Sequence, residues 1–266
     1  MQIGRYRVSF HNHGTFRLDG GAMFGSVPKV LWERVAPADD ANRIVMATRS
    51  LIIEHGERKM LVDTGCGDKW NAKTRAIFDL PDAAYQPVAG VTDVLLTHLH
   101  FDHAGGISRL ESGMPLPNYP HAIHHVPREN LANARDPHPR ERASYLAENI
   151  DMLSQVDLRL TDDNLDVWPG LTVHRSDGHT RGLMWLTLAD GGETLAYPTD
   201  LVPTSHHLPL PYAMGYDMCA ETVIEEKRLF LDQAVAGNWL VVFEHDPVVE
   251  AARLAFDERG RAVVSG

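Results

Sequence analysis

The stretch "THLHFDHAGG", residues 97–106, constrains this chain more than any other part of the sequence. It places three histidines and one aspartate within six positions, directly after an apolar, β-branched run. Alternate residues of an extended strand point the same way, so His98 and His100 can reach one ion. Asp102 and His103 lie where the strand gives way to a glycine-rich turn, and they can face a second ion.

The competing interpretation of this stretch is four polar residues in a surface turn. Neutral imidazole and carboxylate are, however, preferred ligands of zinc and similar ions. With 15 histidines in 266 residues, a chance H-x-H-x-D-H is roughly a one-in-several-hundred event. The pattern therefore favours a metal site.

Polar residues follow apolar, strand-like runs at three further points. His179 lies in "SDGHTRG", Asp200 ends "LAYPTD", and His245 follows the buried run "WLVVF". Singly, each has an ordinary explanation: a turn histidine, an N-cap aspartate or a loop histidine. Together they can supply the missing ligands of a two-metal site, if the strand ends meet in one cleft.

The remaining sequence predicts a mixture of strands and helices. We expect strands at 3–10, 44–55, 58–63, 91–97, 156–160, 171–176, 182–188, 193–198 and 239–243, with 44–55 and 58–63 forming a hairpin. Helices are expected near 68–79, 139–155 and 218–236, and long loops at 14–43 and 112–140. Strands dominate each half, which predicts an α/β or α+β sandwich of two packed sheets with helices outside. We expect one domain spanning 1–266.

Composition excludes several classes of function. The net charge of −11 disfavours a nucleic-acid partner, because such partners need a basic face. Two cysteines, Cys66 and Cys219, are too few for a disulfide framework. No run approaches the roughly 18 apolar residues of a membrane span, and no secretory signal is visible. We therefore expect a cytoplasmic protein that acts on a small-molecule substrate, away from membranes.

The ligand pattern resembles that of the metallo-β-lactamase superfamily. The motif at residues 98–103 and the three later residues follow the family's order and approximate spacing, and "KMLVDTG" (59–65) matches its typical preceding strand. The resemblance implies a four-layer αββα sandwich, with two mixed sheets inside, helices outside and the metals at one edge. It implies two ligand groups joined by a bridging aspartate: His98, His100 and His179 on the first metal, Asp102, His103 and His245 on the second, and Asp200 bridging both.

Within that family, the motifs are similar to those of the lactonase and organophosphate-hydrolase branch. His100 replaces the glutamate of the di-iron flavoproteins, and Asp200 stands where zinc β-lactamases with this motif place cysteine or serine. Only 21 residues follow His245, too few for the helical domain of the glyoxalase II branch. The acidic charge and the lack of a large insertion argue against the nucleases. Acyl-homoserine-lactone lactonases and 4-pyridoxolactonase show similar "HLHxDHAGG", "GHxxG", "D" and "HD" signatures.

The chemistry that follows is hydrolysis. A water bridged by two metals has a pKa near neutrality, and the resulting hydroxide attacks a carbonyl or phosphoryl centre. Asp102 can relay a proton to the leaving group. We expect a small lactone or ester as substrate, and zinc as the default metal, although the same ligands accept iron, manganese or cobalt. A phosphotriesterase or phosphodiesterase, a di-iron redox protein, and a metal-binding module without catalysis remain alternatives.

Two tyrosines are candidate catalytic residues outside the ligand set. Related lactonases place a tyrosine after the bridging aspartate, where its hydroxyl can assist the substrate carbonyl. Tyr212 and Tyr216 occupy the comparable stretch here, with packing against the following helix as the alternative. For the nearby His206 and His207 we expect a loop role.

The loop around "DGGAMFGSVPKVLW" is the candidate substrate wall. Met23, Phe24 and Trp32 can offer apolar contacts to a ring or an acyl chain. The alternative is that they seal the core or an oligomer interface, so a homodimer also stays open. Asp63 is expected to support the metal ligands from behind, and Cys66 to serve packing.

Overall fold

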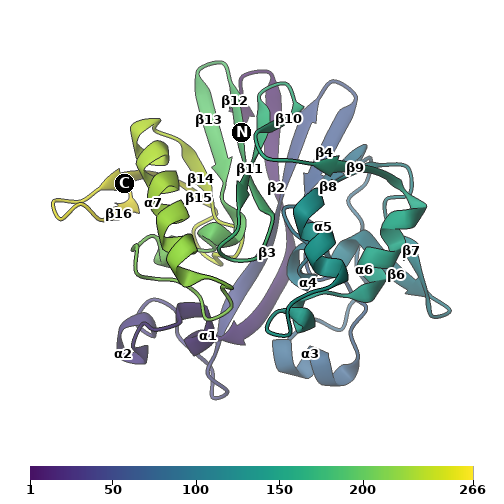
Figure 1. Cartoon of the computed structure of the whole chain (residues 1–266), viewed down its shortest axis with the longest axis horizontal. Helices are drawn as coiled ribbons and strands as arrows, with labels where there is room; N and C mark the ends of the chain where they lie inside the picture. Colours follow the sequence, from purple (N-terminus) through teal and green to yellow (C-terminus); the bar gives the residue numbers. More distant parts are fainter. Residues whose placement is uncertain (266) are drawn as a thin grey trace.

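Two seven-stranded mixed sheets form the centre of the computed structural model, which describes residues 1–265 (Figure 1). The strands of the first sheet are, in spatial order, β1 (Gln2–Ile3), β2 (Tyr6–Asp19), β3 (Arg43–His55), β4 (Arg58–Val62), β5 (Asp93–Leu95), β8 (Ile123–Pro127) and β9 (Asp157–Thr161). Those of the second are β10 (Leu165–Trp168), β11 (Leu171–Ser176), β12 (Leu183–Asp190), β13 (Glu193–Tyr197), β14 (Leu240–Val242), β15 (Ala251–Phe256) and β16 (Ala262–Val264). A separate hairpin joins β6 (Ser108–Glu111) to β7 (Met114–Pro117).

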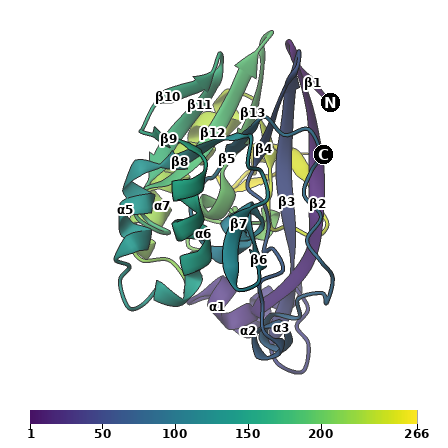
Figure 2. The same ribbon diagram turned by 90° about the vertical axis from the view of Figure 1, so that its right-hand side faces the viewer.

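Helices cover both outer faces and one end of this pair of sheets (Figure 1). The helices are α1 (Gly20–Phe24), α2 (Lys29–Trp32), α3 (Ala72–Phe78), α4 (Phe101–Ala104), α5 (Arg128–Arg135), α6 (Ala147–Met152) and α7 (Ala220–Ala236). Figure 2 shows α5 and α6 beside each other over the first sheet, and α7 covers the second. No helix among residues 1–265 is both long and apolar enough to cross a membrane.

The period-two pattern of the strands explains the four layers. In β4, Met60 faces the core between the sheets, whereas Leu61 faces the core under α5 and α6. In β12, Leu186 faces the core between the two sheets, whereas Leu183 packs under α7. Successive side chains of a strand point to opposite faces, and here both faces are covered. Such strands are continuous apolar runs because neither face meets water.

Helix α7 is held by one apolar stripe. Val223, Phe230, Leu231 and Ala234 are buried against the second sheet, at the spacing of one helical face. This confirms the amphipathic helix expected at 218–236, apart from its first two residues. Burial of each large apolar side chain contributes roughly 1.5–3 kcal/mol.

Strand ends from both sheets point to the same edge. Strand β5 is parallel to β4 and β8, and β14 is parallel to β13. Strand β11 runs in the direction of β13, because both are antiparallel to β12. The segments that follow β11, β13 and β14 therefore leave the second sheet at one end, and the residues that follow β5 in the first sheet meet them there.

The two long loops expected from sequence are wrong in part. Strand β2 continues to Asp19 and pairs with β3 after a bulge, so residues 14–19 are strand, and α1 and α2 follow. The 112–140 region contains β7, β8 and α5. Strand β8, "IHHVP", was missed because its two buried histidines and its proline hide the apolar pattern. Strands β10, β15 and β16 near the sheet edge were also missed, whereas the 44–55/58–63 hairpin is confirmed.

Candidate metal centre

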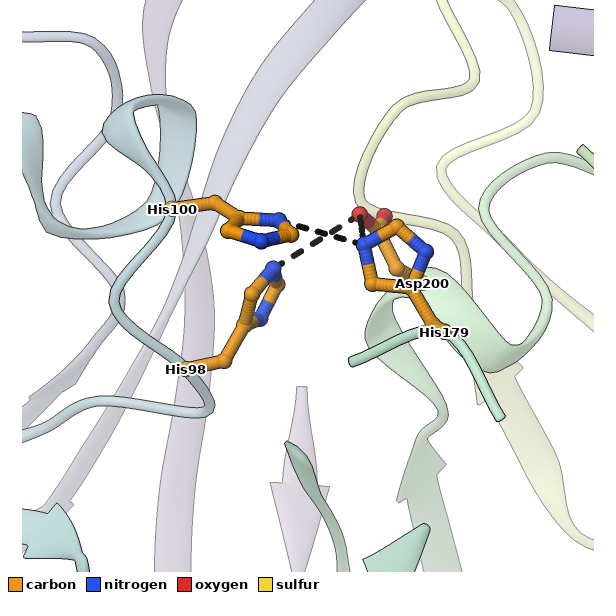
Figure 3. A group of neighbouring side chains, drawn as sticks. All are labelled: His98, His100, His179 and Asp200. Carbon is orange, nitrogen blue, oxygen red and sulfur yellow. Dashed lines mark hydrogen bonds and ion pairs between the residues drawn. The ribbon is translucent and has the colours of Figure 1, made fainter. Parts of the chain in front are cut away.

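The seven predicted ligand side chains converge in two adjacent groups. Within each group the candidate ligand atoms lie within 4.8 Å of one another. Figure 3 shows the first group facing inward from both sheets. The first group consists of His98, His100, His179 and Asp200, and the second of Asp102, His103 and His245.

Local structure explains how one short motif serves both groups. His98 follows β5, and His100 is the N-cap residue of α4. Asp102 and His103 then lie within the single turn of α4, which turns them away from the strand direction. The switch from extended to helical backbone thus divides the motif between two positions.

Asp200 lies between the two groups. It belongs to the 3-10 helix η4 (Thr199–Leu201) after β13, and the preceding Thr199 has a φ of 48°. Its Oδ2 lies 3.1 Å from Nε2 of His179, and its Oδ1 lies 3.1 Å from Nε2 of His245. Oδ2 also lies 3.4 Å from Nε2 of His103, so the Asp200 carboxylate contacts histidines of both groups.

The interior of the cluster holds buried polar atoms without a hydrogen-bond partner. One of them is Nε2 of His98, which lies 3.7 Å from Oδ2 of Asp200. Buried polar atoms are nearly always bonded in folded proteins. Imidazole nitrogens and carboxylate oxygens that point at one another in this way can bind a divalent metal ion, which uses both as ligands.

The charges of the cluster also favour a cation. Burial disfavours the charged imidazolium, but the neighbouring carboxylates outweigh burial. Asp200 and Asp217 raise the pKa of His179 to about 10, and Asp200 and Glu244 raise that of His245 to about 9. Burial would raise the pKa of Asp200, but His103, His179 and His245 outweigh it and lower that pKa well below its ordinary value. At His98 burial dominates and holds the pKa well below 6.5, so this imidazole is neutral and able to bind metal.

Each imidazole has a second partner on its outward side. Nδ1 of His103 lies 3.0 Å from Oδ2 of Asp63, and Nδ1 of His179 lies 2.9 Å from Oδ1 of Asp217. The remaining partners are Ala47 O for His245 (2.8 Å), Thr97 Oγ1 for His98 (3.2 Å) and Glu141 Oε2 for His100 (3.5 Å). Such partners fix the orientation of ligand rings and the nitrogen that faces the metal.

Asp63 lies where the sequence placed it, and three further carboxylates were missed. Glu244 contacts Nδ1 of His103 at 3.1 Å, while Glu141 and Asp217 face His100 and His179. Glu244 directly precedes His245 and follows the apolar run "WLVVF", and a charged residue at that position could have indicated a role in supporting the ligands. Glu141 and Asp217 lie in loops with no spacing relation to the motif, and no local signal marks them.

A cavity of about 340 Å³ opens onto the ligands. Its floor includes His100, Asp102, His179, Asp200 and His245. Its apolar wall comprises Leu18, Met23, Phe78, Phe101 and Met214, and its polar wall includes Arg140, Glu141, Ser144 and Tyr216.

Only Met23 of the three predicted wall residues lines this cavity. Phe24 and Trp32 are each 1% exposed and stack on one another, with ring centroids 5.5 Å apart. Successive side chains of a helix point about 100° apart, so α1 directs Met23 to the cavity and Phe24 into the core. The expectation that Phe24 and Trp32 form the substrate wall is corrected: they support it from behind.

The two candidate tyrosines have different surroundings. Tyr216 lines the cavity, and burial raises its pKa to about 12, so its hydroxyl keeps its proton at neutral pH. Tyr212 packs edge-on against Phe24 and lines a separate surface groove together with His206. It is therefore not placed to touch a substrate at the ligands.

Two further residues have packing surroundings. His207 stacks on Phe24 at 4.8 Å, and its Nε2 lies 2.9 Å from the carbonyl oxygen of Met23. The Cys66 side chain is buried, and burial raises the pKa of its thiol well above the ordinary value. A thiol in this state is a poor nucleophile.

Comparison with known proteins independently identifies the family of this chain. Residues 43–246 match the family model of the Metallo-beta-lactamase superfamily. A segment of 77 residues is 30% identical to the Drosophila melanogaster Beta-lactamase-like protein 2 homolog. That match covers 29% of this chain and spans only 25% of the curated relative.

Solved structures share the fold over the whole chain. A probable metal-dependent hydrolase from Staphylococcus aureus is 26% identical, with a TM-score of 0.90 over 100% of this chain and 99% of that one. AidC, described as a dizinc quorum-quenching lactonase, is 18% identical, with a TM-score of 0.78 over 100% and 96% of the two chains. The hydrolase AbOPH is 20% identical, with a TM-score of 0.76 over 99% and 95%. With the family match and the converging histidines and aspartates, the chain belongs to the metallo-β-lactamase superfamily.

Proposed function

We propose that this protein hydrolyses a small lactone or ester with two divalent metal ions held by the seven clustered side chains. The observation that carries the proposal is the position of Asp200. Its two oxygens lie 3.1 Å from a histidine nitrogen of the first group and 3.1 Å from one of the second. A carboxylate shared in this way suits two neighbouring ions better than one closed structural site.

The ligand set also defines which metals the site accepts. All seven donors are imidazole nitrogens or carboxylate oxygens, which favours zinc and also accepts iron, manganese or cobalt. When bound, two divalent ions lower the pKa of a shared water toward neutrality and polarise a carbonyl oxygen. The similarity to a lactonase described as dizinc supports zinc.

Two residues of the chain have the surroundings for proton handling and carbonyl binding. Asp102 lines the cavity, with its oxygens 3.9 Å and 3.8 Å from Nε2 of His103 and of His245. We assign it to accept a proton and pass it to the leaving alkoxide. Tyr216 keeps its hydroxyl proton and can donate a hydrogen bond to the substrate's carbonyl or leaving oxygen.

The cavity indicates a small, partly apolar substrate. Its volume of about 340 Å³ is at the lower end of ordinary ligand sites. Leu18, Phe78 and Phe101 offer an apolar surface beside the ligands. The substrate carbonyl then lies over the ligands while an alkyl or aryl group packs against this wall. Structural neighbours described as a quorum-quenching lactonase and as an N-acyl homoserine lactone hydrolase support the lactone class.

The test is hydrolysis of a substrate panel by protein of defined metal content. The panel should contain alkyl lactones, aryl esters and a phosphotriester, each measured as purified, after chelation, and after readdition of Zn²⁺. We expect two ions per chain, turnover of lactones or esters, loss on chelation and recovery with zinc. Phosphotriester turnover alone would favour the phosphotriesterase alternative, and a visible absorption band that bleaches on reduction would favour a di-iron redox protein. A protein that binds no metal, with stability unaffected by chelator, would contradict the proposal.

A further inference from the structure

Two chain segments, 138–144 and 212–217, line the same cavity. The first contributes Arg140, Glu141, Ala143 and Ser144 to the lining, and the second contributes Met214, Gly215 and Tyr216. Each segment also sends one carboxylate to a histidine of the first ligand group. The cavity wall and the support of that group are therefore made from the same two loops.

Glu141 is the carboxylate of the 138–144 segment. It is 5% exposed, and its Oε2 lies 3.5 Å from Nε2 of His100. It also accepts hydrogen bonds from Oγ1 of Thr180 (2.6 Å) and Nδ2 of Asn133 (2.9 Å). Thr180 directly follows His179, so one carboxylate restrains His100 and the turn that carries His179.

Asp217 is the carboxylate of the 212–217 segment. It is 4% exposed, and its Oδ1 accepts from Nδ1 of His179 at 2.9 Å. Its Oδ2 accepts from the backbone N–H of Met214 at 2.7 Å, which closes the segment into a tight turn. The orientation of His179 therefore depends on where this turn lies.

Arg140 joins the two segments. Its Nη2 donates to the carbonyl oxygen of Gly215 and, at 3.3 Å, to that of Asp217. It is adjacent in sequence to Glu141, and its two acceptors flank Tyr216. The Arg140 guanidinium thus links the two carboxylate-bearing loops.

We propose that Arg140 is a positioning residue that holds Glu141 and Asp217 against His100 and His179, and so keeps the first metal ion in place. The inference rests on the proposed two-metal function. A planar guanidinium suits this role because its donors have fixed directions, whereas an ammonium is a flexible point charge. The second ligand group contacts neither segment's carboxylate, so it stays unaffected by Arg140.

The test compares the release of metal from the holoenzyme of several variants. The protein is loaded with two equivalents of Co²⁺, and the visible band is followed after addition of excess chelator. Loss of an outer partner of a ligand histidine typically costs 10–100-fold in metal affinity. Because Arg140 acts one contact further out, we expect R140A to accelerate one of two release phases about tenfold and to leave the other unchanged. R140K should recover part of the loss.

Two controls isolate the proposed contact. R142A changes an arginine of the same segment whose guanidinium donates to Pro137 O at 3.4 Å, away from Asp217, and should release metal as the wild type does. If Arg140 acts through Asp217, the two substitutions are not additive. R140A in the D217N background should then accelerate metal release by less than half as much as R140A does in the wild type.

Several outcomes would overturn the inference. Equal release from R140A, R142A and wild type would do so, as would equal acceleration of both phases or full additivity of R140A with D217N. Each leaves the two-metal hydrolase intact if the wild type still binds two ions. A wild-type protein that takes up no Co²⁺ or Zn²⁺ overturns the proposed function and this inference together.

Discussion

The two ligand groups are supported by different parts of the molecule. In the second group, His103 is held by Asp63 and Glu244, and His245 by the carbonyl oxygen of Ala47 in β3. These partners lie on or directly after central strands, and both carboxylates are at most 1% exposed. In the first group, His100 and His179 depend on Glu141 and Asp217, which lie in loops at the cavity.

Within one site, the second group is therefore tied to the stability of the fold, whereas the first group is tied to the loops that line the cavity. The second group is continuous with the packed sheets, so its geometry is fixed once the core forms. The first group takes its geometry from segments that also meet the substrate. Changes at the two groups should therefore differ in whether they affect stability or metal retention, and four experiments test this division.

The largest effect is expected where the groups meet. D200N removes the charge shared between them, so both should lose metal and hydrolysis should fall by more than the roughly 100-fold associated with outer partners. Turnover and metal content of the purified variant check this. D82N, at a carboxylate that is 99% exposed, should behave as wild type. Retention of two ions by D200N would show that Asp200 is not shared.

A direct comparison of the supports should give the next largest effect. Asp63 is fully buried and accepts from Thr97 N (2.8 Å), Thr97 Oγ1 (2.6 Å) and His103. D63A should therefore lower the free energy of unfolding by roughly 3–5 kcal/mol, the cost of breaking a buried charged network. D217A should lower it by less than half as much while releasing metal faster. Urea unfolding of the metal-free proteins measures the first effect, and chelator competition the second. Equal stability losses would remove the distinction between the groups.

The pH dependence of the free energy of unfolding should show whether Glu141, in the 138–144 segment, is ionised in the folded protein. Burial would raise the pKa of Glu141, but the nearby His100 imidazole and the hydrogen bonds from Thr180 and Asn133 outweigh it and lower that pKa from 4.5 to about 2. The folded state therefore prefers the ionised carboxylate, and this stabilisation is complete above about pH 4.5 and lost as pH falls toward 2. E141Q should lose less stability than wild type over that interval when the metal-free proteins are unfolded at each pH. E111Q, at a carboxylate that is 64% exposed, should follow wild type. Parallel wild-type and E141Q curves would argue against a charged Glu141 at His100.

The smallest effect is expected at the two tyrosines. Y216F removes a hydroxyl at the cavity, and the loss of one hydrogen bond corresponds to roughly two- to tenfold in kcat. Y212F should leave kcat and KM unchanged, because this side chain packs against Phe24 away from the cavity. Steady-state kinetics on the best ester of the panel compare them. A larger effect of Y212F would show that the 212–217 segment moves during turnover.

Several elements could be predicted because their signals are local. The hairpin β3–β4 and helix α7 follow from period-two and helical patterns of apolar residues. The expected ligands come together because they lie in the short segments that follow β5, β11, β13 and β14. Strand β8 could not be predicted, since its histidines are buried by tertiary contacts rather than by an apolar pattern.

By itself, the sequence determined the sandwich fold, the family and the residues that could bind metal. Strand periodicity and a dense histidine motif depend only on neighbouring residues, so both can be recognised before folding. Only the tertiary structure decided that Met23 faces the cavity while Phe24 and Trp32 support it from the core. It also decided that Glu141 and Asp217 face ligand histidines. Loops far apart in the chain come into contact only after the two sheets have packed, and the spacing of residues in the sequence does not predict such contacts.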